Sequence, residues 1–263
     1  MTDATPTLAA DGALRALLAR QSVLAVVRAP EIPDAAALCQ ALHDGGICVV
    51  ELTFSTPKVE EHVARARAYA ATHAQDGASS GQDGIVVGVG TVTRVDQARS
   101  AIDAGASFLV TPGMGQATGD IVGIAHDAGV PVMVGALTPS EVISATELGA
   151  DVVKIFPASL GGPRLISDLR GPFPDVPLVP SGGVSADNAQ AFLDAGAIAV
   201  CAGTGVVPPA AVAAADWALI RRAAGEFRSR LSTPAPAQPH SSTPSRTSTP
   251  SQTASPSRTA SPQ

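Results

Sequence analysis

One short pattern recurs along the chain and constrains its fold more than any other feature. A glycine stands before a short apolar run in "DGGICVVEL", "DAGASFLVT", "DAGVPVMVG", "LGADVVKIF" and "DAGAIAVCAG". Each glycine follows a helical pattern, so it is expected to end a helix in the left-handed conformation. The apolar runs are typical of strands that are buried on both faces. The glycines concerned are Gly45, Gly105, Gly129, Gly149 and Gly196.

The number of such units indicates the architecture. Strands are predicted at 23–28, 47–52, 85–91, 107–111, 131–135, 152–156, 177–181 and 197–203. Helices are predicted between them, with another from Ala210 to about Arg228, and 72–84 is expected to be a loop remote from the active face. Eight units in roughly 200 residues predict an α/β fold, a (β/α)8 TIM barrel. An open doubly wound sheet is the alternative, but its phosphate-binding glycines would follow the first strand, whereas here glycine pairs come late.

The composition changes after Leu231. Residues 1–231 are expected to form the barrel domain, whereas 232–263 contain no Leu, Ile, Val, Met or aromatic residue. Such a segment buries too little apolar surface to offset its ordering entropy, so a disordered Ser/Thr/Pro-rich tail is predicted. An inert solubilising tail and a phosphorylated or partner-binding tail both stay open.

Charge and hydropathy limit the classes of partner. The formal net charge of −6 argues against nucleic acid. No run approaches the roughly 18 apolar residues of a membrane span, and the first residues lack the pattern of a signal peptide. The odd number of cysteines, without metal-type spacing, predicts small buried side chains in a reducing cytoplasm. These cysteines are Cys39, Cys48 and Cys201.

Histidine placement favours chemistry without a metal or another cofactor. None of the histidines falls at the end of a predicted strand, which removes the usual zinc constellations. They are His43, His62, His73, His126 and His240.

Two charged residues interrupt apolar strands. Lys154 stands within "VVKIF", and Glu51 follows "ICVV". Strands two and six lie opposite each other in an eight-stranded ring, so the two side chains are expected to meet at its mouth. A structural ion pair, or a lysine that snorkels from an edge strand, is the simpler interpretation. Burying an ion pair often stabilises no better than apolar packing, which favours a nucleophilic lysine with a carboxylate acid/base. The apolar interior is expected to lower the pKa of Lys154 and so free its amine.

Further polar or distinctive residues follow the predicted strands, at the end where barrel enzymes carry their chemistry. They are Arg28, Thr53, Ser55, Thr91, Pro112 and Phe156. Two glycine turns come after the last two strands, Ser181-Gly182-Gly183 and Gly203-Thr204-Gly205, the first leading into a helix expected near Ala186 or Asp187. Glycines let backbone N–H groups approach an anion, and this fold binds phosphate after strands seven and eight. A phosphate site is therefore predicted.

The phrases "VVELTFSTP", "GVGTVT", "VTPG", "VVKIFPAS", "GPFPDVPLVPSGGVSADN" and "AVCAGTGVV" resemble the 2-keto-3-deoxy-6-phosphogluconate aldolases, also called 4-hydroxy-2-oxoglutarate aldolases. The resemblance covers about residues 12 to 228. It implies a homotrimeric class I pyruvate aldolase in which Lys154 forms the Schiff base and Glu51 is the general acid/base. It also implies a pyruvate pocket and a phosphate site. The pocket would be lined by Thr91, Pro112 and Phe156, and the phosphate held by Gly182, Gly183, Gly203 and Thr204.

The chain departs from the family pattern at a few positions. Ser55 stands where some members have an arginine for the substrate carboxylate, so Arg28 is expected to hold that group, with Thr91 and backbone N–H groups. Arg28 reaching the phosphate, or pairing with Glu31, is the alternative. Ser181 and Thr204 keep hydroxyl groups where threonine and serine are usual. Ser159 replaces a glutamate of some relatives, without a clear effect.

Other functions fit parts of the pattern. An aldolase for the epimeric 2-keto-3-deoxy-6-phosphogalactonate tolerates the same residues after strand two. A phosphosugar isomerase or epimerase on this fold would use Lys154 electrostatically. A non-catalytic phosphate-binding barrel would need only the glycine turns. Schiff-base trapping separates the aldolases from the last two, and product stereochemistry separates the aldolases from each other.

Overall fold

The computed structural model describes residue 8 and residues 12–80 and 84–232. Its described part contains the eight predicted strands, all parallel, so the (β/α)8 barrel is confirmed. The strands are β1 (Val23–Val27), β2 (Val49–Thr53), β3 (Val86–Gly90), β4 (Leu109–Val110), β5 (Val132–Ala136), β6 (Val152–Ile155), β7 (Leu178–Pro180) and β8 (Val200–Ala202).

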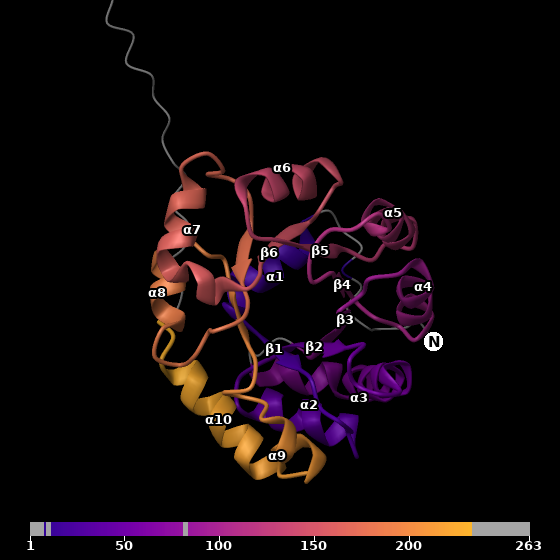
Figure 1. Ribbon diagram of the computed structural model, residues 1–263. Helices are drawn as coiled ribbons and strands as arrows, with labels where there is room; N and C mark the ends of the chain where they lie inside the picture. The colour runs from indigo at the N-terminus through magenta and orange to yellow at the C-terminus, as the bar shows by residue number, and fades with distance from the viewer. Residues whose placement is uncertain (1–7, 9–11, 81–83, 233–263) are drawn as a thin grey trace, which may run out of the picture.

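The strands form a nearly closed ring, which Figure 1 shows end-on. They are ordered β7-β6-β5-β4-β3-β2-β1-β8, so β8 pairs with β1, with Val23 opposite Val200. Between β7 and β8 the backbone N–H of Ile198 donates to the carbonyl of Leu178 at 3.0 Å. Sequential order with the last strand beside the first is the arrangement of a barrel, so the open doubly wound alternative is wrong.

Helices surround the ring (Figure 1). One of them, α1, precedes β1, and its Leu14, Leu17 and Leu18 pack with inward-facing strand residues and cover the amino-terminal end of the barrel. The helices are α1 (Ala13–Gln21), α2 (Ala35–Asp44), α3 (Val59–Ser80), α4 (Val95–Asp103), α5 (Thr118–Asp127), α6 (Pro139–Glu147), α7 (Gly162–Arg170), α8 (Ala189–Asp194), α9 (Pro209–Ala213) and α10 (Trp217–Ser229), with a 3-10 turn η1 (Ala158–Leu160) after β6.

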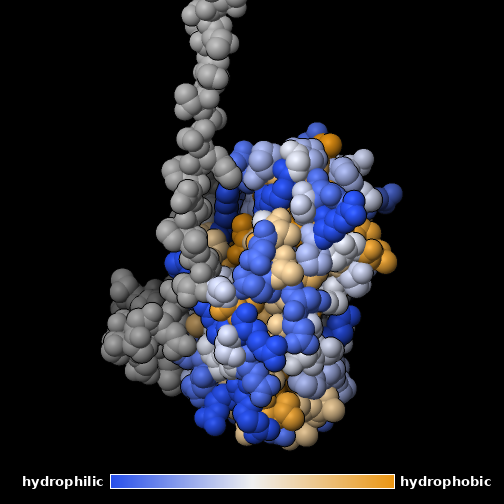
Figure 2. Space-filling view, turned by 90° about the vertical axis from the view of Figure 1, so that its left-hand side faces the viewer, coloured by the Kyte–Doolittle hydropathy of each residue, from blue (hydrophilic) through white to orange (hydrophobic). Residues whose placement is uncertain are grey.

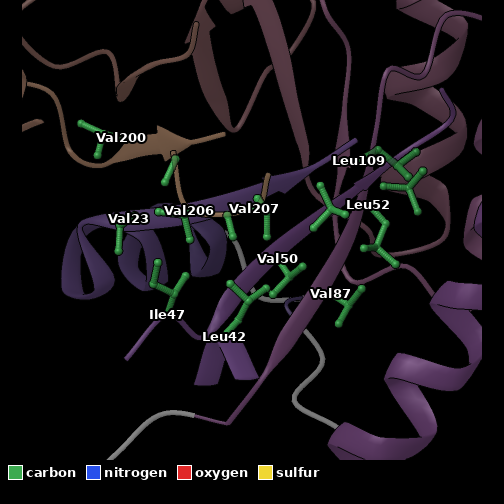
Figure 3. Close-up of a cluster of buried hydrophobic side chains, with 14 of the residues drawn as sticks. Val23, Leu42, Ile47, Val50, Leu52, Val87, Leu109, Val200, Val206 and Val207 are labelled. Carbon is green, nitrogen blue, oxygen red and sulfur yellow. The ribbon is translucent and has the colours of Figure 1, made fainter. Parts of the chain in front are cut away.

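Two buried clusters lie on the two sides of the sheet. Outward-facing residues such as Val50 and Leu52 pack against helices, for example against Leu42 of α2 (Figure 3). Their neighbours Val49 and Glu51 point into the barrel, because successive strand side chains alternate between faces. The inner cluster is apolar at the amino-terminal end, where Val49 belongs to it. The two buried charged side chains of the strands, Glu51 and Lys154, lie nearer to the carboxyl-terminal end.

Two predicted segments differ from the structure. The expected loop at 72–84 is wrong, because α3 continues to Ser80. Its "ARARAYAATHAQ" run is rich in alanine, the strongest helix former, which outweighs the following glycine. The expected single helix over 210–228 is divided into α9 and α10. Ala215 takes a left-handed φ of 54°, and the side chain of Asp216 then caps α10 by accepting from the N–H of Leu219 at 3.0 Å.

The prediction of left-handed glycines at the helix ends is correct at four of the five positions, and at the fifth the left-handed residue is one position later. Gly45 has a φ of −84°, and the left-handed residue is Gly46 with a φ of 83°. A side chain at Gly45 would collide with Ala224 of α10, so close packing explains that glycine. The left-handed conformation is confirmed at the other predicted glycines, which are Gly105, Gly129, Gly149 and Gly196. The helix expected near Ala186 or Asp187 begins later, at Ala189.

The surface is mainly hydrophilic on the side of α7, α8 and α10, with scattered hydrophobic patches (Figure 2). Within the described residues, no helix combines the length and the apolar character that crossing a bilayer requires. The three cysteines are free and buried, as predicted. The predicted disordered tail lies outside the described residues from position 233 onward.

Candidate active site

A cavity of about 360 Å³ opens at the carboxyl-terminal end of the barrel. Most of the predicted site residues line it, although they come from strands far apart in the sequence. Its floor carries Lys154, and its rim carries both Arg28 and the first glycine turn. The lining residues are Val26, Arg28, Thr91, Pro112, Lys154, Phe156, Ser181, Gly182, Gly183, Val184, Cys201 and Gly203.

Lys154 and Glu51 form a buried ion pair across the ring. The ammonium nitrogen Nζ lies 3.3 Å from each carboxylate oxygen of Glu51. The exposed fraction is 6% for Lys154 and 1% for Glu51. Because β2 and β6 face each other across the barrel, their inward side chains meet at its centre, as the sequence predicted. The Nζ atom also lies 6.0 Å from the centre of the Phe156 ring.

The predicted lowering of the pKa of Lys154 is wrong. Burial does lower it, but the attraction and hydrogen bonds of Glu51 outweigh burial, so the pKa is raised above that of an ordinary lysine. Arg28 acts weakly in the lowering direction. At neutral pH Lys154 is therefore a charged ammonium group. It becomes a nucleophile only after losing a proton, and Glu51 is the acceptor within reach.

Arg28 and Thr91 stand together on the cavity wall. Arg28 Nη2 donates to Thr91 Oγ1 at 3.5 Å. Thr91 has a φ of 59°, a left-handed conformation that is rare for a β-branched residue. Such a conformation costs on the order of 1–3 kcal/mol, and strained residues of this kind cluster at functional sites. The backbone after β3 is thus held so that a hydroxyl group and a guanidinium group face the same space.

Ser55 and Thr204 do not line this cavity. Thr53 Oγ1 donates to the carbonyl of Val27 at 3.0 Å, so it can only accept from Ser55 Oγ, which lies 2.8 Å away. The hydroxyl proton of Ser55 is directed at Thr53. Thr204 is exposed in the loop after β8. Among the residues that do line the cavity, Arg28 is the only guanidinium group.

The turn after β7 is fixed by a residue that the sequence reading missed. Gly182 and Gly183 are both left-handed, with φ values of 83° and 78°. Asn188 donates from Nδ2 to the carbonyl of Gly183 at 2.9 Å, and its Oδ1 accepts from the N–H of Ser185 at 2.8 Å. Because the C=O and N–H of one peptide point in opposite directions, the N–H of Val184 points away from Asn188. The side chain of Asn188 therefore sets which groups this turn offers to a ligand.

Three further lining residues were not predicted: Val26, Val184 and Cys201. Cys201 lies on β8 two positions before the lining residue Gly203, and a period of two would have placed it on the inward face. Burial raises the pKa of the Cys201 thiol to about 11, so it stays neutral. No group of three or more His, Cys, Asp or Glu residues that could hold a metal ion lies within the described ranges 12–80 and 84–232.

Comparison with known proteins gives one consistent result. Residues 14–223 match the profile of a protein family described as "KDPG and KHG aldolase". A protein of Treponema pallidum named 2-dehydro-3-deoxy-phosphogluconate aldolase is 34% identical over 206 residues, which cover 77% of this chain and 90% of the relative. A protein of the same name from Pseudomonas aeruginosa is 31% identical over 211 residues, or 80% of this chain and 89% of the relative.

A solved structure resembles the fold and the sequence together. It is KDPG aldolase from Legionella pneumophila with pyruvate captured as a covalent carbinolamine intermediate. Its TM-score is 0.68 at 26% identity, and the match covers 83% of this chain and 98% of that one.

Proposed function

Since this chain belongs to the KDPG and KHG aldolase family, we propose that it cleaves 2-keto-3-deoxy-6-phosphogluconate (KDPG) to pyruvate and glyceraldehyde 3-phosphate by a lysine Schiff base. The observation that carries the proposal is the buried pair of Lys154 and Glu51 at the floor of a cavity whose rim holds the glycine turn. The pair supplies a nucleophile with its base, and the turn supplies backbone donors for a phosphate. No metal and no organic cofactor take part in this chemistry.

The first steps require Lys154 to exchange its proton. Transfer to Glu51 leaves a neutral amine and a neutral carboxylic acid, a pair that tolerates burial better than a lone ammonium ion. The amine attacks carbon 2 of the keto acid and forms a carbinolamine. Glu51 then returns a proton to the departing hydroxyl group, so that water leaves and a protonated Schiff base remains.

Cleavage uses the same carboxylate a second time. The cationic C=N bond attracts electrons from the bond between carbons 3 and 4. Glu51, again ionised, takes the proton of the carbon 4 hydroxyl, directly or through a water molecule. The C3–C4 bond breaks and the aldehyde leaves. The electron pair of that bond becomes the double bond between carbons 2 and 3, which gives an enamine attached to Lys154. Protonation at carbon 3 and hydrolysis then release pyruvate and free Lys154.

The two ends of the substrate meet different groups. We assign the carboxylate to Arg28 and Thr91, because a guanidinium group pairs well with a carboxylate and these residues share one wall of the cavity. Pro112 and Phe156 line the pyruvate end. We assign the phosphate to the backbone of Gly182 and Gly183, with Gly203 on the facing loop and the Ser181 hydroxyl beside them. Thr204 is exposed beside Gly203 and contributes only if its loop moves.

A direct test combines trapping and turnover. Borohydride with pyruvate should reduce a Schiff base on the protein, whereas an isomerase, an epimerase or a non-catalytic barrel would give no adduct. Pyruvate release should then be measured from KDPG, from its galactonate epimer and from 4-hydroxy-2-oxoglutarate (KHG), which releases glyoxylate. A preference for the phosphorylated acids supports the phosphate assignment. Equal specificity constants for KDPG and KHG would contradict it.

We further propose a cytoplasmic homotrimer. The association is supported by large apolar side chains exposed on η1 and on or directly after α6, namely Ile143, Leu148 and Leu160, of which Leu160 is 72% exposed. Exposed apolar side chains that form a contiguous patch are typical of surfaces that bind another protein chain. Sedimentation of the purified chain should give three times the mass of one protomer. Leu160→Asp should shift that mass toward the monomer, and a monomeric wild type would overturn the proposal.

A further inference from the structure

The carboxylate of Glu51 occupies space that a neighbouring glycine leaves empty. A side-chain carbon added to Gly90 of β3 would lie 2.7 Å from Cγ of Glu51 and closer still to its carboxylate. The three heavy atoms nearest to that added carbon all belong to Glu51. Any residue other than glycine at position 90 must therefore displace the carboxylate from its place beside Lys154.

The strand register explains this contact. Glu51 lies opposite Gly88, and Thr53 lies opposite Gly90. Because Glu51 faces inward, Gly88 opposite it lies on the inner face, and so does Gly90 two residues further on. The Glu51 side chain extends along the strand direction and ends over Gly90, one inward position nearer to the barrel mouth. From there both of its oxygens reach Nζ of Lys154 at 3.3 Å.

We propose that Gly90 is a positioning residue, whose missing side chain forms the slot that holds the Glu51 carboxylate against Lys154. The catalytic part of this inference rests on the proposed function, because it takes Glu51 as the acid/base. The positional part depends only on the contact between the two residues. A larger residue at 90 separates the pair, and Lys154 is then left in an apolar site without its counter-charge.

The other inward glycine of β3 provides a matched control. A side chain at Gly88 would overlap the ring of Phe108 rather than the carboxylate. Gly88 and Gly90 thus share a strand, a face and burial, but only at Gly90 would an added side chain meet the Glu51 carboxylate first. Any general effect of a bulky residue inside the barrel should appear in both variants, whereas an effect through Glu51 should appear in one.

The experiment compares Gly90→Ala with Gly88→Ala in the full chain. For Gly90→Ala, turnover of KDPG should fall about 100-fold or more, as for removal of a positioned acid/base. The pH at which half of Lys154 is trapped with pyruvate should move to lower values, because the charge that raises its pKa has moved away. Gly88→Ala is expected to lower the unfolding temperature but to leave this pH midpoint unchanged.

A double variant covers the case in which Gly90→Ala does not fold. Glu51→Ala removes the carboxylate, so adding Gly90→Ala to it should change neither the unfolding temperature nor the residual turnover. A double variant clearly less stable than Glu51→Ala would overturn the inference, as would Gly90→Ala with a wild-type pH midpoint. Normal turnover in Glu51→Gln would instead refute the proposed acid/base role, while the pH midpoint would still test the position of the carboxylate.

Discussion

Lys154 Nζ lies 3.3 Å from both oxygens of Glu51, although the two residues are 103 positions apart in the sequence. This pairing raises the pKa of Lys154 despite its burial. A raised pKa in the folded state means that the pair stabilises the barrel below the pKa of an unfolded lysine, near 10.4, and loses that contribution as the pH rises through the folded value. At neutral pH Lys154 is therefore protonated, and in the proposed mechanism its proton passes to Glu51 before the amine attacks the keto acid.

Lys154 should be the only lysine that forms a Schiff base with pyruvate. Borohydride reduction with pyruvate, followed by peptide mass mapping, should place the adduct on Lys154. Lys58, the other lysine of the chain, is exposed directly before α3 and serves as the internal control. Lys154→Arg keeps the charge beside Glu51 but cannot form an imine, so turnover should be abolished. An adduct on Lys58 would refute the assignment, as would a Lys154→Arg variant that retains turnover.

Glu51→Gln should impair the chemistry and move the titration of Lys154. The amide keeps the shape of the side chain but cannot shuttle protons, so turnover should fall about 100- to 10,000-fold. Loss of the negative charge lowers the pKa of Lys154, so trapping with pyruvate should reach its half-maximum at a lower pH. Glu226→Gln, on the exposed side of α10, is the matched control and should behave as wild type. A pH midpoint that stays in place would show that Glu51 does not control Lys154.

Arg28→Ala should weaken the binding of the keto acid. If Arg28 holds the carboxylate, the Michaelis constant for pyruvate in the condensation direction should rise about 10-fold or more, the range expected for losing a charged hydrogen bond of 1.5–3 kcal/mol. If Arg28 holds the phosphate instead, only phosphorylated aldehydes should be affected. Arg94→Ala removes a surface arginine that pairs with Asp96 and is the control. Unchanged constants for both substrates would leave Arg28 without a role in binding.

Asn188→Ala should act on phosphorylated substrates alone. It frees the carbonyl of Gly183 and the N–H of Ser185, so the glycine turn loses its fixed orientation. The specificity constant for KDPG should fall about 10-fold, because the variant loses two hydrogen bonds that contribute roughly 0.5–1.5 kcal/mol each. The constant for KHG and the trapping of pyruvate should not change. Gln190→Ala, in the first turn of α8, is the control. An equal loss with both substrates would mean that Asn188 only supports the fold.

Gly183→Val should damage the same site more severely. Its φ of 78° is unfavourable for valine, and the new side chain would start 2.6 Å from Cβ of Ser159. We expect a larger loss with KDPG than in Asn188→Ala, measured as the ratio of the KDPG and KHG specificity constants. If both constants fall by the same factor, the turn is only architecture and the phosphate lies elsewhere.

Much of this protein could be predicted from local sequence. Apolar runs predicted all eight strands, five of them after a glycine at the end of a helical pattern, because a strand buried on both faces has few other compositions open to it. Lys154 and Glu51 stood out because a charge inside such a run is costly unless it has a partner or a task. Errors at this level had local causes: alanine continued α3 to Ser80, and Gly46 replaced Gly45 as the left-handed residue.

Tertiary structure alone decided how the site is arranged, because its distances join strands that the sequence keeps far apart. The direction of the pKa shift of Lys154 depends on how near Glu51 comes, and the apolar neighbours in the sequence indicated the opposite. The hydroxyl proton of Ser55 is directed at Thr53 only because the Thr53 hydroxyl already donates its hydrogen bond to the carbonyl of Val27 on the neighbouring strand. Gly90 has no signature of its own in "GVGT", and its importance appears only when the carboxylate of β2 is seen to fill its place. Residue type and periodicity determined which groups face the barrel interior, and closure of the ring determined which of them meet.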